Sequence, residues 1–102
     1  MILERCTQKI ISTNKEAFAL EKKFDALEAK VGNVPVKRRY MPGYSGHMAN
    51  TFIWERDWPS MAALESYNEK ISKDPEWAEV FEEARGVFAE IKFELFRIIT
   101  LR

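Results

Sequence analysis

The sequence predicts an α+β protein with a ferredoxin-like, split βαβ arrangement (β-α-β-β-α-α-β) and one four-stranded antiparallel sheet. Four segments carry apolar residues in the alternating or clustered manner of strands, and three carry them at the three- and four-residue steps of helices. Turn and cap residues separate these segments in the order expected for that fold. The 102 residues contain no repeat or linker, so we expect a single domain over 1–102.

The first strand and helix are predicted from residues 2–31. Residues 2–11 alternate loosely and include Ile, Cys and Thr, which favour a strand. Thr13 and Glu16 have the spacing of a capping box at the start of a helix. Gly32 stands where a left-handed residue would end that helix. The predicted buried stripe consists of Ala17, Leu20, Phe24, Leu27 and Val31.

The second and third strands are predicted at residues 34–41 and 48–56. Pro35 cannot donate to a strand ladder, which predicts that the second strand lies at a sheet edge and that the first and third are central. Residues 43–46 contain two glycines and predict the turn that joins the two strands.

Residues 58–60 end the third strand and begin the second helix. Pro59 disfavours helical geometry at Trp58, and Ser60 is a favourable N-cap. We expect Trp58 and Trp77 to seal the junction between this strand and the helices. The predicted stripe of the second helix consists of Met61, Leu64, Tyr67 and Ile71.

The third helix is predicted to begin at Asp74-Pro75-Glu76, with Asp74 as cap and Pro75 in the first turn. Its buried stripe would run through Trp77, Val80, Phe81, Ala84, Val87, Phe88 and Ile91. Gly86 inside this run would weaken the helix by about 1 kcal/mol, which suggests that another element backs it closely. Residues 91–101 fit either a continued helix or a strand, and we predict a strand from their β-branched and aromatic residues.

Composition narrows the possible functions. Sixteen basic and sixteen acidic residues give no net charge, so we expect neither nucleic acid nor an anionic membrane as partner. No apolar run approaches the ~20 residues of a membrane span. Cys6 is the only cysteine, which excludes an internal disulfide and favours the cytoplasm. One histidine, one thiol and scattered carboxylates do not form a metal motif, and we expect no cofactor.

Strands three and four predict a sheet that is apolar on both faces. Trp54 shares one face of its strand with Phe52, while Ile53 takes the other, and the last strand likewise has no polar side. Helices cover one face of such a sheet. We therefore expect a homodimer in which a second copy covers the remaining sheet face.

Several short motifs resemble a known group of proteins. They are Met1-Ile2-Leu3-Glu4-Arg5, Trp54-Glu55, Ser60-Met61-Ala62-Ala63 and Asp74-Pro75-Glu76-Trp77. Together they are similar to the NIPSNAP-like branch of the dimeric α+β barrel superfamily, over essentially the whole chain. The resemblance implies a ferredoxin-like homodimer whose two sheets form a barrel. It implies no single activity, because this superfamily includes cofactor-free monooxygenases, haem-degrading enzymes, dismutases and effector-sensing modules.

Asn50 and Trp54 are one candidate pair, four residues apart on a predicted strand and hence on one face. Their spacing resembles that of an Asn and Trp pair lining the cavity of antibiotic-biosynthesis monooxygenases. An amide can hold a carbonyl or peroxide oxygen while an indole stacks on a flat substrate. The alternative is that Trp54 packs in the dimer core and Asn50 satisfies backbone groups near a turn.

Basic residues form a second candidate site. Lys37, Arg38 and Arg39, with Arg5 and Arg97, could bind an anion at the mouth of a cleft. Charge on an edge strand also prevents strands of different molecules from pairing, and we favour that role.

The other candidates have structural alternatives. His47 has a pKa suited to acid–base chemistry, but a loop position is the simpler interpretation. Cys6 is expected to be a buried apolar group. Glu4 shares its face and could meet Arg97, in an ion pair or a cavity lining. Glu55, Arg56 and Asp57 are interpreted as surface charges that end the strand.

The favoured function is binding of a small hydrophobic or aromatic molecule in the cleft of each subunit. The ligand-binding candidates are Glu4, Cys6, Arg39, Asn50, Trp54 and Arg97, and the catalytic candidates are Asn50, Trp54 and His47. One alternative is a cofactor-independent monooxygenase of the antibiotic-biosynthesis type. The other is a regulatory or interaction module in which the dimer itself is the function and side chains fill the cleft.

Overall fold

The computed structural model describes residues 1–42 and 50–101. Its elements follow the predicted order of strand, helix, strand, strand, helix, helix and strand. They are β1 (Ile2–Ile10), α1 (Asn14–Val31), β2 (Arg38–Tyr40), β3 (Thr51–Trp58), α2 (Met61–Ser72), α3 (Pro75–Ala84) and β4 (Phe88–Arg97). The predicted α+β, ferredoxin-like class is confirmed.

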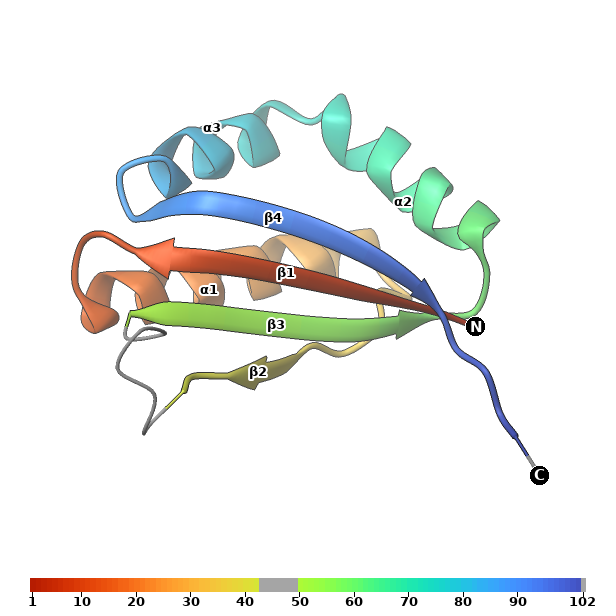
Figure 1. The fold of residues 1–102 in the computed structure, drawn as a ribbon. Coiled ribbons are helices and arrows are strands. Elements are labelled where there is room, and N and C mark those ends of the chain that lie inside the picture. Colours follow the sequence, from red (N-terminus) through yellow and green to blue (C-terminus); the bar gives the residue numbers. More distant parts are fainter. Residues whose placement is uncertain (43–49, 102) are drawn as a thin grey trace.

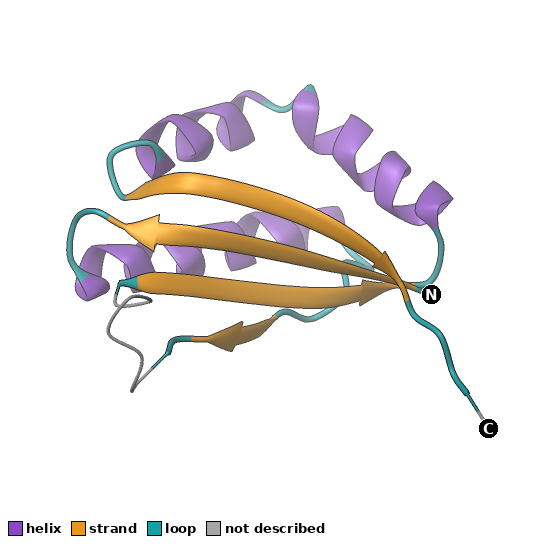
Figure 2. Cartoon of the chain, in the orientation of Figure 1, coloured by secondary structure: helices purple, strands orange, loops and turns teal. Residues whose placement is uncertain are grey.

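The four strands form one antiparallel sheet in the order β2-β3-β1-β4. Strands β1 and β3 are central and β2 lies at an edge, as predicted, although Pro35, from which the edge position was predicted, lies before β2 and outside it. The helices lie on one side of the sheet, with α1 behind β1 and β3 and with α2 and α3 arching beyond β4 (Figures 1 and 2). The opposite face of the sheet, which we call the free face, carries no helix from residues 1–42 or 50–101.

Each helix begins at the cap that the sequence predicts. The side chain of Thr13 accepts a hydrogen bond of 3.1 Å from the Glu16 backbone N–H. Ser60 and Asp74 do the same for the second and third helices, at 3.2 and 2.9 Å. Gly32, with φ of 81°, ends α1 in a backbone conformation that glycine adopts without strain.

The third helix is shorter than predicted. It ends at Ala84, and Phe88 and Ile91 lie on β4, although their spacing continues the helical stripe. Gly86 therefore lies in a turn. A methyl group built on it would meet only the Glu83 backbone oxygen, at 3.7 Å, so the expected close backing by another element is absent from the described structure. The strands also differ at their ends, because β2 is limited to 38–40, β3 begins at 51 and β4 ends at 97.

A β-bulge divides β4. Ala89 pairs with Lys9 and Lys92 pairs with Thr7, so Glu90 and Ile91 together lie opposite Gln8. Glu90 has a φ of 52°, which is unusual for a residue other than glycine. The extra residue reverses the side-chain alternation of the strand. It thereby places the next odd-numbered residues of β4 on the helix-covered face.

The core lies between the sheet and the helices. Trp58 and Trp77 are both 3% exposed, and the Tyr67 ring lies between them at centroid distances of 5.1 and 5.9 Å. This confirms the predicted junction between β3 and the helices. The buried apolar residues are Cys6, Ile10, Ala17, Leu20, Leu27, Phe52, Trp54, Trp58, Leu64, Tyr67, Trp77, Val80, Ala84, Val87 and Phe88.

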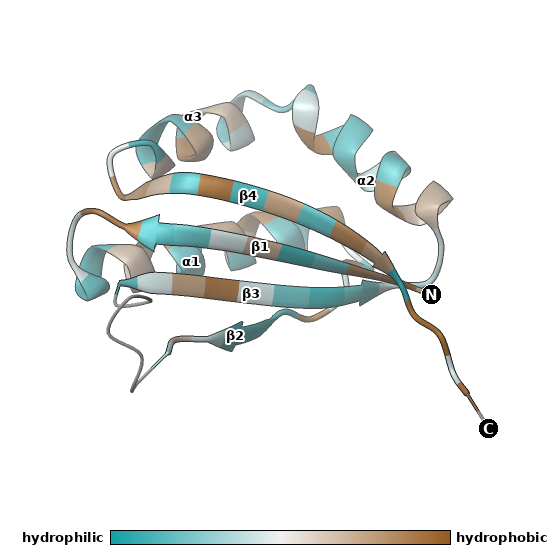
Figure 3. Cartoon of the chain, in the orientation of Figure 1, coloured by the Kyte–Doolittle hydropathy of each residue, from teal (hydrophilic) through white to brown (hydrophobic). Residues whose placement is uncertain are grey.

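The free face is not the continuous apolar surface that the sequence predicts. Alternation along β1 and β3 places charged residues there, and Arg5 pairs with Glu55 at 2.7 Å while Arg38 pairs with Asp57 at 3.1 Å. Phe96 lies among them, beneath the Arg5 guanidinium. Exposed apolar residues instead gather on β4 and in the segment after it, where Figure 3 marks hydrophobic residues in brown. They are Ile91, Phe93, Leu95, Phe96, Ile98, Ile99 and Leu101.

Candidate functional site

A cavity of about 510 Å³ lies between the helix-covered face of the sheet and the helices. Strands β1, β3 and β4 contribute to its walls, as do all three helices and Lys37. Its lining residues are Glu4, Cys6, Gln8, Glu21, Phe24, Glu28, Lys37, Trp54, Arg56, Tyr67, Asn68, Ile71, Trp77, Phe81, Ala84, Arg85, Phe88, Ile91 and Phe93. We call this space the sheet–helix cavity.

Aromatic side chains form much of the cavity wall. The Phe24 ring of α1 lies 6.0 Å from the Trp77 ring and 5.5 Å from the Phe81 ring of α3. On the sheet, the edge of one ring meets the face of the other in the pair Trp54 and Phe93, with centroids 6.0 Å apart. Such walls suit flat, apolar molecules, which gain both burial and ring stacking.

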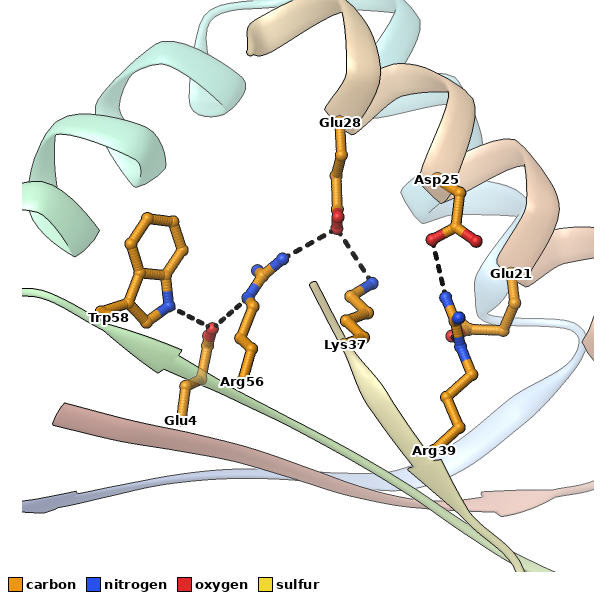
Figure 4. A network of polar contacts seen from close by, with 8 residues as sticks. All are labelled: Glu4, Glu21, Asp25, Glu28, Lys37, Arg39, Arg56 and Trp58. Carbon is orange, nitrogen blue, oxygen red and sulfur yellow. Dashed lines mark hydrogen bonds and ion pairs between the residues drawn. The ribbon is translucent and has the colours of Figure 1, made fainter. Parts of the chain in front are cut away.

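Four buried charged residues meet at the cavity wall, and we call them the buried ion cluster: Glu4, Glu28, Lys37 and Arg56 (Figure 4). Arg56 donates from Nε to Glu4 at 2.8 Å and from a terminal nitrogen to Glu28 at 2.9 Å. The same Glu28 oxygen lies 2.9 Å from the Lys37 ammonium. The four side chains are between 3% and 10% exposed, so their charges are screened by one another and hardly by water.

Strand register and helix spacing bring this cluster together. Glu4 and Arg56 occupy paired positions of β1 and β3 on the helix-covered face. Glu21, Asp25 and Glu28 are spaced by four and three residues on α1, which places them along one side of the helix. That stripe faces Lys37 and strand β2, and in β2 Arg39 donates to Glu21 at 2.9 Å and to Asp25 at 2.7 Å.

Aromatic rings enclose the cations of the cluster. The Arg56 guanidinium lies 4.8, 5.1 and 4.9 Å from the ring centroids of Trp54, Trp58 and Tyr67. The Trp58 indole also donates to Glu4 at 2.9 Å. The Lys37 ammonium lies 4.5 Å from the Trp54 centroid and 5.5 Å from that of Phe24. Each cation is thus stabilised by ring faces in addition to its carboxylate.

Burial shapes the protonation of this region. It raises the pKa of the Cys6 thiol to about 12, against a smaller opposing effect of Lys37, so the thiol is protonated at neutral pH and is a poor nucleophile. Burial also raises the pKa of Tyr67. For Arg56, burial lowers the pKa, but the charges of Glu4 and Glu28 outweigh this effect and the pKa is raised. The cluster therefore keeps its cation at any ordinary pH.

The structure brings three of the predicted site residues together. Glu4, Cys6 and Trp54 all line the sheet–helix cavity. Arg39 is not a lining residue and is held by the acidic stripe of α1. Arg97 lies opposite Ile2 at the end of β4, and Glu4 binds Arg56 rather than Arg97.

The predicted catalytic residues are not gathered in the described structure. Asn50 precedes β3 with a φ of 66°, is exposed and does not line the cavity, so it does not share a strand face with Trp54. The strand begins one residue later, because Asn50 adopts the left-handed conformation that asparagine tolerates better than most residues. His47 lies outside the described residues.

The basic residues before and within β2 do not form an anion-binding mouth. Lys37 and Arg39 bind carboxylates of α1, whereas Arg38 turns to the free face and binds Asp57. Arg5 likewise binds Glu55. Each of these cations already has a carboxylate partner, which leaves no concentration of free positive charge for an anion.

Arg56 and Glu28 are charged cavity residues that the sequence analysis does not predict, and it places Lys37 in an anion site rather than in the cavity wall. Arg56 was interpreted as a surface charge, yet it is 3% exposed. The signal was present, because Arg56 has the same strand parity as Trp54 and Trp58, both assigned to packing. Glu28 and Lys37 offered no comparable signal, since their position depends on how α1 crosses the sheet.

Two features are absent from residues 1–42 and 50–101. No group of three His, Cys, Asp or Glu residues there could hold a metal ion. None of the helices in these ranges is long and apolar enough to cross a membrane.

Comparisons with known proteins relate the chain to others by fold. No family model and no curated protein matches the sequence. A NIPSNAP family protein from Agrobacterium tumefaciens has a similar structure, with a TM-score of 0.76 and 10% identity over 94% of this chain and 90% of that one. An uncharacterized NIPSNAP domain protein from Burkholderia xenovorans gives a TM-score of 0.73 and 13% identity, over 100% of this chain and 98% of that one. An antibiotic biosynthesis monooxygenase gives a TM-score of 0.61 and 10% identity, over 98% of this chain and 100% of that one. The chain therefore has the fold of NIPSNAP and antibiotic biosynthesis monooxygenase structures.

Proposed function

We propose that the protein binds a small hydrophobic or aromatic molecule in the sheet–helix cavity. The observation that carries this proposal is the cavity itself, whose volume of about 510 Å³ is lined by aromatic rings together with a few fixed polar groups. Ligand sites in proteins commonly enclose about 300–1,000 Å³ and have this mixture of lining residues. An open cavity supports ligand binding over a module in which side chains fill the cleft.

The monooxygenase alternative has less support. It depends on Asn50 acting with Trp54, and Asn50 is not a lining residue of the cavity. Cys6, the thiol in the cavity, is protonated at neutral pH, which removes it as a ready nucleophile. Binding of an aromatic molecule needs neither group, so we propose binding without assigning a reaction.

The test is a thermal-shift screen of small aromatic and aliphatic compounds. Hits should raise the melting temperature in a saturable manner. Ile71→Trp replaces an aliphatic side chain of the cavity wall with a bulky ring and should abolish the shift. Ile11→Trp, at an exposed residue outside the cavity, should preserve it. Failure of a broad panel to stabilise the wild-type protein, or equal shifts in both variants, would contradict the proposal.

We further propose that the protein acts as a homodimer in a reducing compartment such as the cytoplasm. Phe96 on the free face and the apolar residues after β4 would be covered by a second copy, and the edge of β4 offers backbone groups for pairing. Light scattering at low concentration should give twice the 12.0 kDa monomer mass. Phe96→Glu should shift the mass toward the monomer, unlike Ile11→Glu. A monomeric wild-type protein would refute the dimer.

A further inference from the structure

The charges of the buried ion cluster cancel. Glu4 and Glu28 each carry a negative charge, and Arg56 and Lys37 each carry a positive one. Glu21, the other carboxylate in the inner wall, binds Arg39. Arg85, the remaining charged lining residue, is exposed and pairs with Glu82. A charged ligand group placed against the buried ion cluster would therefore be an unmatched ion beside side chains that are at most 10% exposed, at a cost of several kcal/mol.

An anionic ligand cannot simply replace Glu28 beside the Lys37 ammonium. The same Glu28 oxygen also accepts from Arg56, so displacing it would break two contacts. Glu28 would remain buried beneath α1 without its partners, and a buried unpaired carboxylate is strongly destabilising. The arrangement of the cluster thus favours an uncharged ligand.

Lys37 is the hydrogen-bond donor best placed to bind an uncharged ligand. An ammonium group has three N–H bonds, and its only carboxylate contact within the described structure is the one to Glu28. The group lies at the cavity wall near the faces of Trp54 and Phe24, at 4.5 and 5.5 Å from their centroids. Because cations already lie over these ring faces, a flat molecule would pack beside the ammonium, against the Phe81 and Phe93 rings of the cavity wall, with an oxygen on its rim directed to the ammonium. Arg56 is less available, because the rings of Trp54, Trp58 and Tyr67 surround its guanidinium at 4.8 to 5.1 Å and two of its nitrogens already donate to carboxylates.

We infer that the cavity selects an uncharged aromatic molecule carrying a carbonyl-type oxygen, and that Lys37 donates the hydrogen bond that recognises this oxygen. The inference rests on the proposed function, since it names the ligand class of the same cavity. In this arrangement the rings supply affinity, and the ammonium group supplies selectivity among ligands of similar size.

The test uses four probes that share one ring system and differ in one substituent. They are naphthalene, acetylnaphthalene, naphthoate and naphthylmethylammonium. Each probe is titrated into the wild-type protein at neutral pH, and calorimetry measures its affinity. Acetylnaphthalene should bind about tenfold more tightly than naphthalene, as expected for one hydrogen bond to a charged donor. Both charged probes should bind at least about tenfold more weakly than acetylnaphthalene.

Lys37→Met tests the assigned donor. Naphthalene should bind the variant as it binds the wild type, which shows that the cavity is intact, while the preference for acetylnaphthalene disappears. The variant cluster has one negative charge in excess, so naphthylmethylammonium should bind it more tightly than it binds the wild type. That increase follows from the lost charge alone, whereas the lost preference for acetylnaphthalene is the result that a purely structural role for Lys37 would not produce. Lys37→Arg should keep part of the acetyl preference, and Lys23→Met, which removes an exposed partner of Glu83, should leave all four affinities unchanged.

The outcomes separate the inference from the proposed function. Tightest binding by naphthoate, or an acetyl preference that survives in Lys37→Met, overturns the inference while the cavity remains a binding site. Absence of binding by all four probes overturns the proposed function and the inference with it. If Lys37→Met does not fold, the order of the four wild-type affinities still decides whether the ligand is uncharged.

Discussion

The Nε atom of Arg56 donates a hydrogen bond of 2.8 Å to Glu4 across the central strand pair, and the two side chains are 3% and 8% exposed. They occupy opposed positions of β1 and β3 beneath the helices. Loss of one member would leave the other as an unmatched buried ion. The fold should therefore tolerate loss of the pair better than loss of the arginine alone.

Arg56→Met should lower the free energy of unfolding by about 3–5 kcal/mol, because Glu4 loses its charged partner and Glu28 keeps only Lys37. Adding Glu4→Gln to this variant should restore part of the loss, with a coupling energy of about 1–3 kcal/mol between the two sites. Urea denaturation of the wild type, both single variants and the double variant at neutral pH measures this coupling. Additive losses would contradict the coupling.

Arg5→Met provides the matched control. Arg5 also lies on a central strand and pairs with a glutamate of β3, Glu55, at 2.7 Å, but on the free face and with 37% of its side chain exposed. Its removal should cost about 1 kcal/mol or less, because Glu55 keeps the Arg38 guanidinium at 3.8 Å and loses the cover of the Arg5 side chain. A cost equal to that of Arg56→Met would mean that burial is not the source of the effect.

Trp58→Phe should lower the free energy of unfolding by about 1.5–3 kcal/mol, since the phenyl ring cannot donate to a charged acceptor. The indole of Trp58 donates to Glu4 at 2.9 Å, while its ring contact with Tyr67 would largely persist. Trp77→Phe is the control, because Trp77 is equally buried and its indole donates no hydrogen bond within the described structure. Urea denaturation compares the two variants, and equal costs would show that ring size matters more than the hydrogen bond.

Much of the fold could be predicted because its signals are local. Thr13, Ser60 and Asp74 each cap a helix through atoms two or three residues away, so the chemistry that starts the helix is visible in the sequence. The edge position of β2 was predicted from Pro35, but that proline lies before the strand, so its missing N–H is not what places β2 at the edge.

The end of α3 and the bulge in β4 could not be predicted in this way. Apolar residues keep helical spacing from Trp77 through Phe88 to Ile91, and no proline marks the break, so periodicity alone extends the helix. The pairing of β4 with β1 ends the helix earlier, at Ala84. Glu90 also takes a positive φ without being glycine, which leaves no trace in residue type.

The candidate site was predictable only in part. Glu4, Cys6 and Trp54 follow from strand parity, because residues of equal parity share a face. The bond from Arg56 to Glu28 joins residues 28 positions apart, and it exists only once α1 has docked on the sheet. Lys37 reaches the same carboxylate from a segment without regular structure. Contacts of this kind are set by tertiary packing and have no sequence spacing of their own.

The stability of the wild-type protein should fall as the pH rises above about 9, in part because of Cys6. Burial raises the pKa of this thiol from 9.0 to about 12, so the unfolded chain ionises first. The stabilisation is complete below the unfolded pKa and is lost as the pH rises toward the folded one. At about pH 10, Cys6 should account for a loss of roughly 1.4 kcal/mol relative to about pH 8.

Cys6→Ala isolates this contribution. Burial also raises the pKa of Tyr67, so this residue likewise lowers the stability of the protein at higher pH. Because Tyr67 is present in both proteins, its effect cancels in the comparison. The variant should be less stable at neutral pH because it lacks the buried sulfur, but its stability should fall less steeply across this range. Urea denaturation at the two pH values gives both slopes, and parallel slopes would mean that the thiol ionises as easily in the folded protein as in the unfolded chain.

Glu90→Gly should leave the free energy of unfolding unchanged or raise it by up to about 1 kcal/mol, because glycine adopts the φ of 52° without the strain of a side chain. Ala89→Gly, at the neighbouring position in regular register with Lys9, should lower it by about 0.5–1 kcal/mol. Urea denaturation of the two variants makes the comparison. The bulge also orients Ile91 and Phe93 toward the cavity. Because glycine should preserve the bulge, the Glu90→Gly variant should bind naphthalene as the wild type does. Equal destabilisation by the two glycines would mean that the positive φ carries no strain.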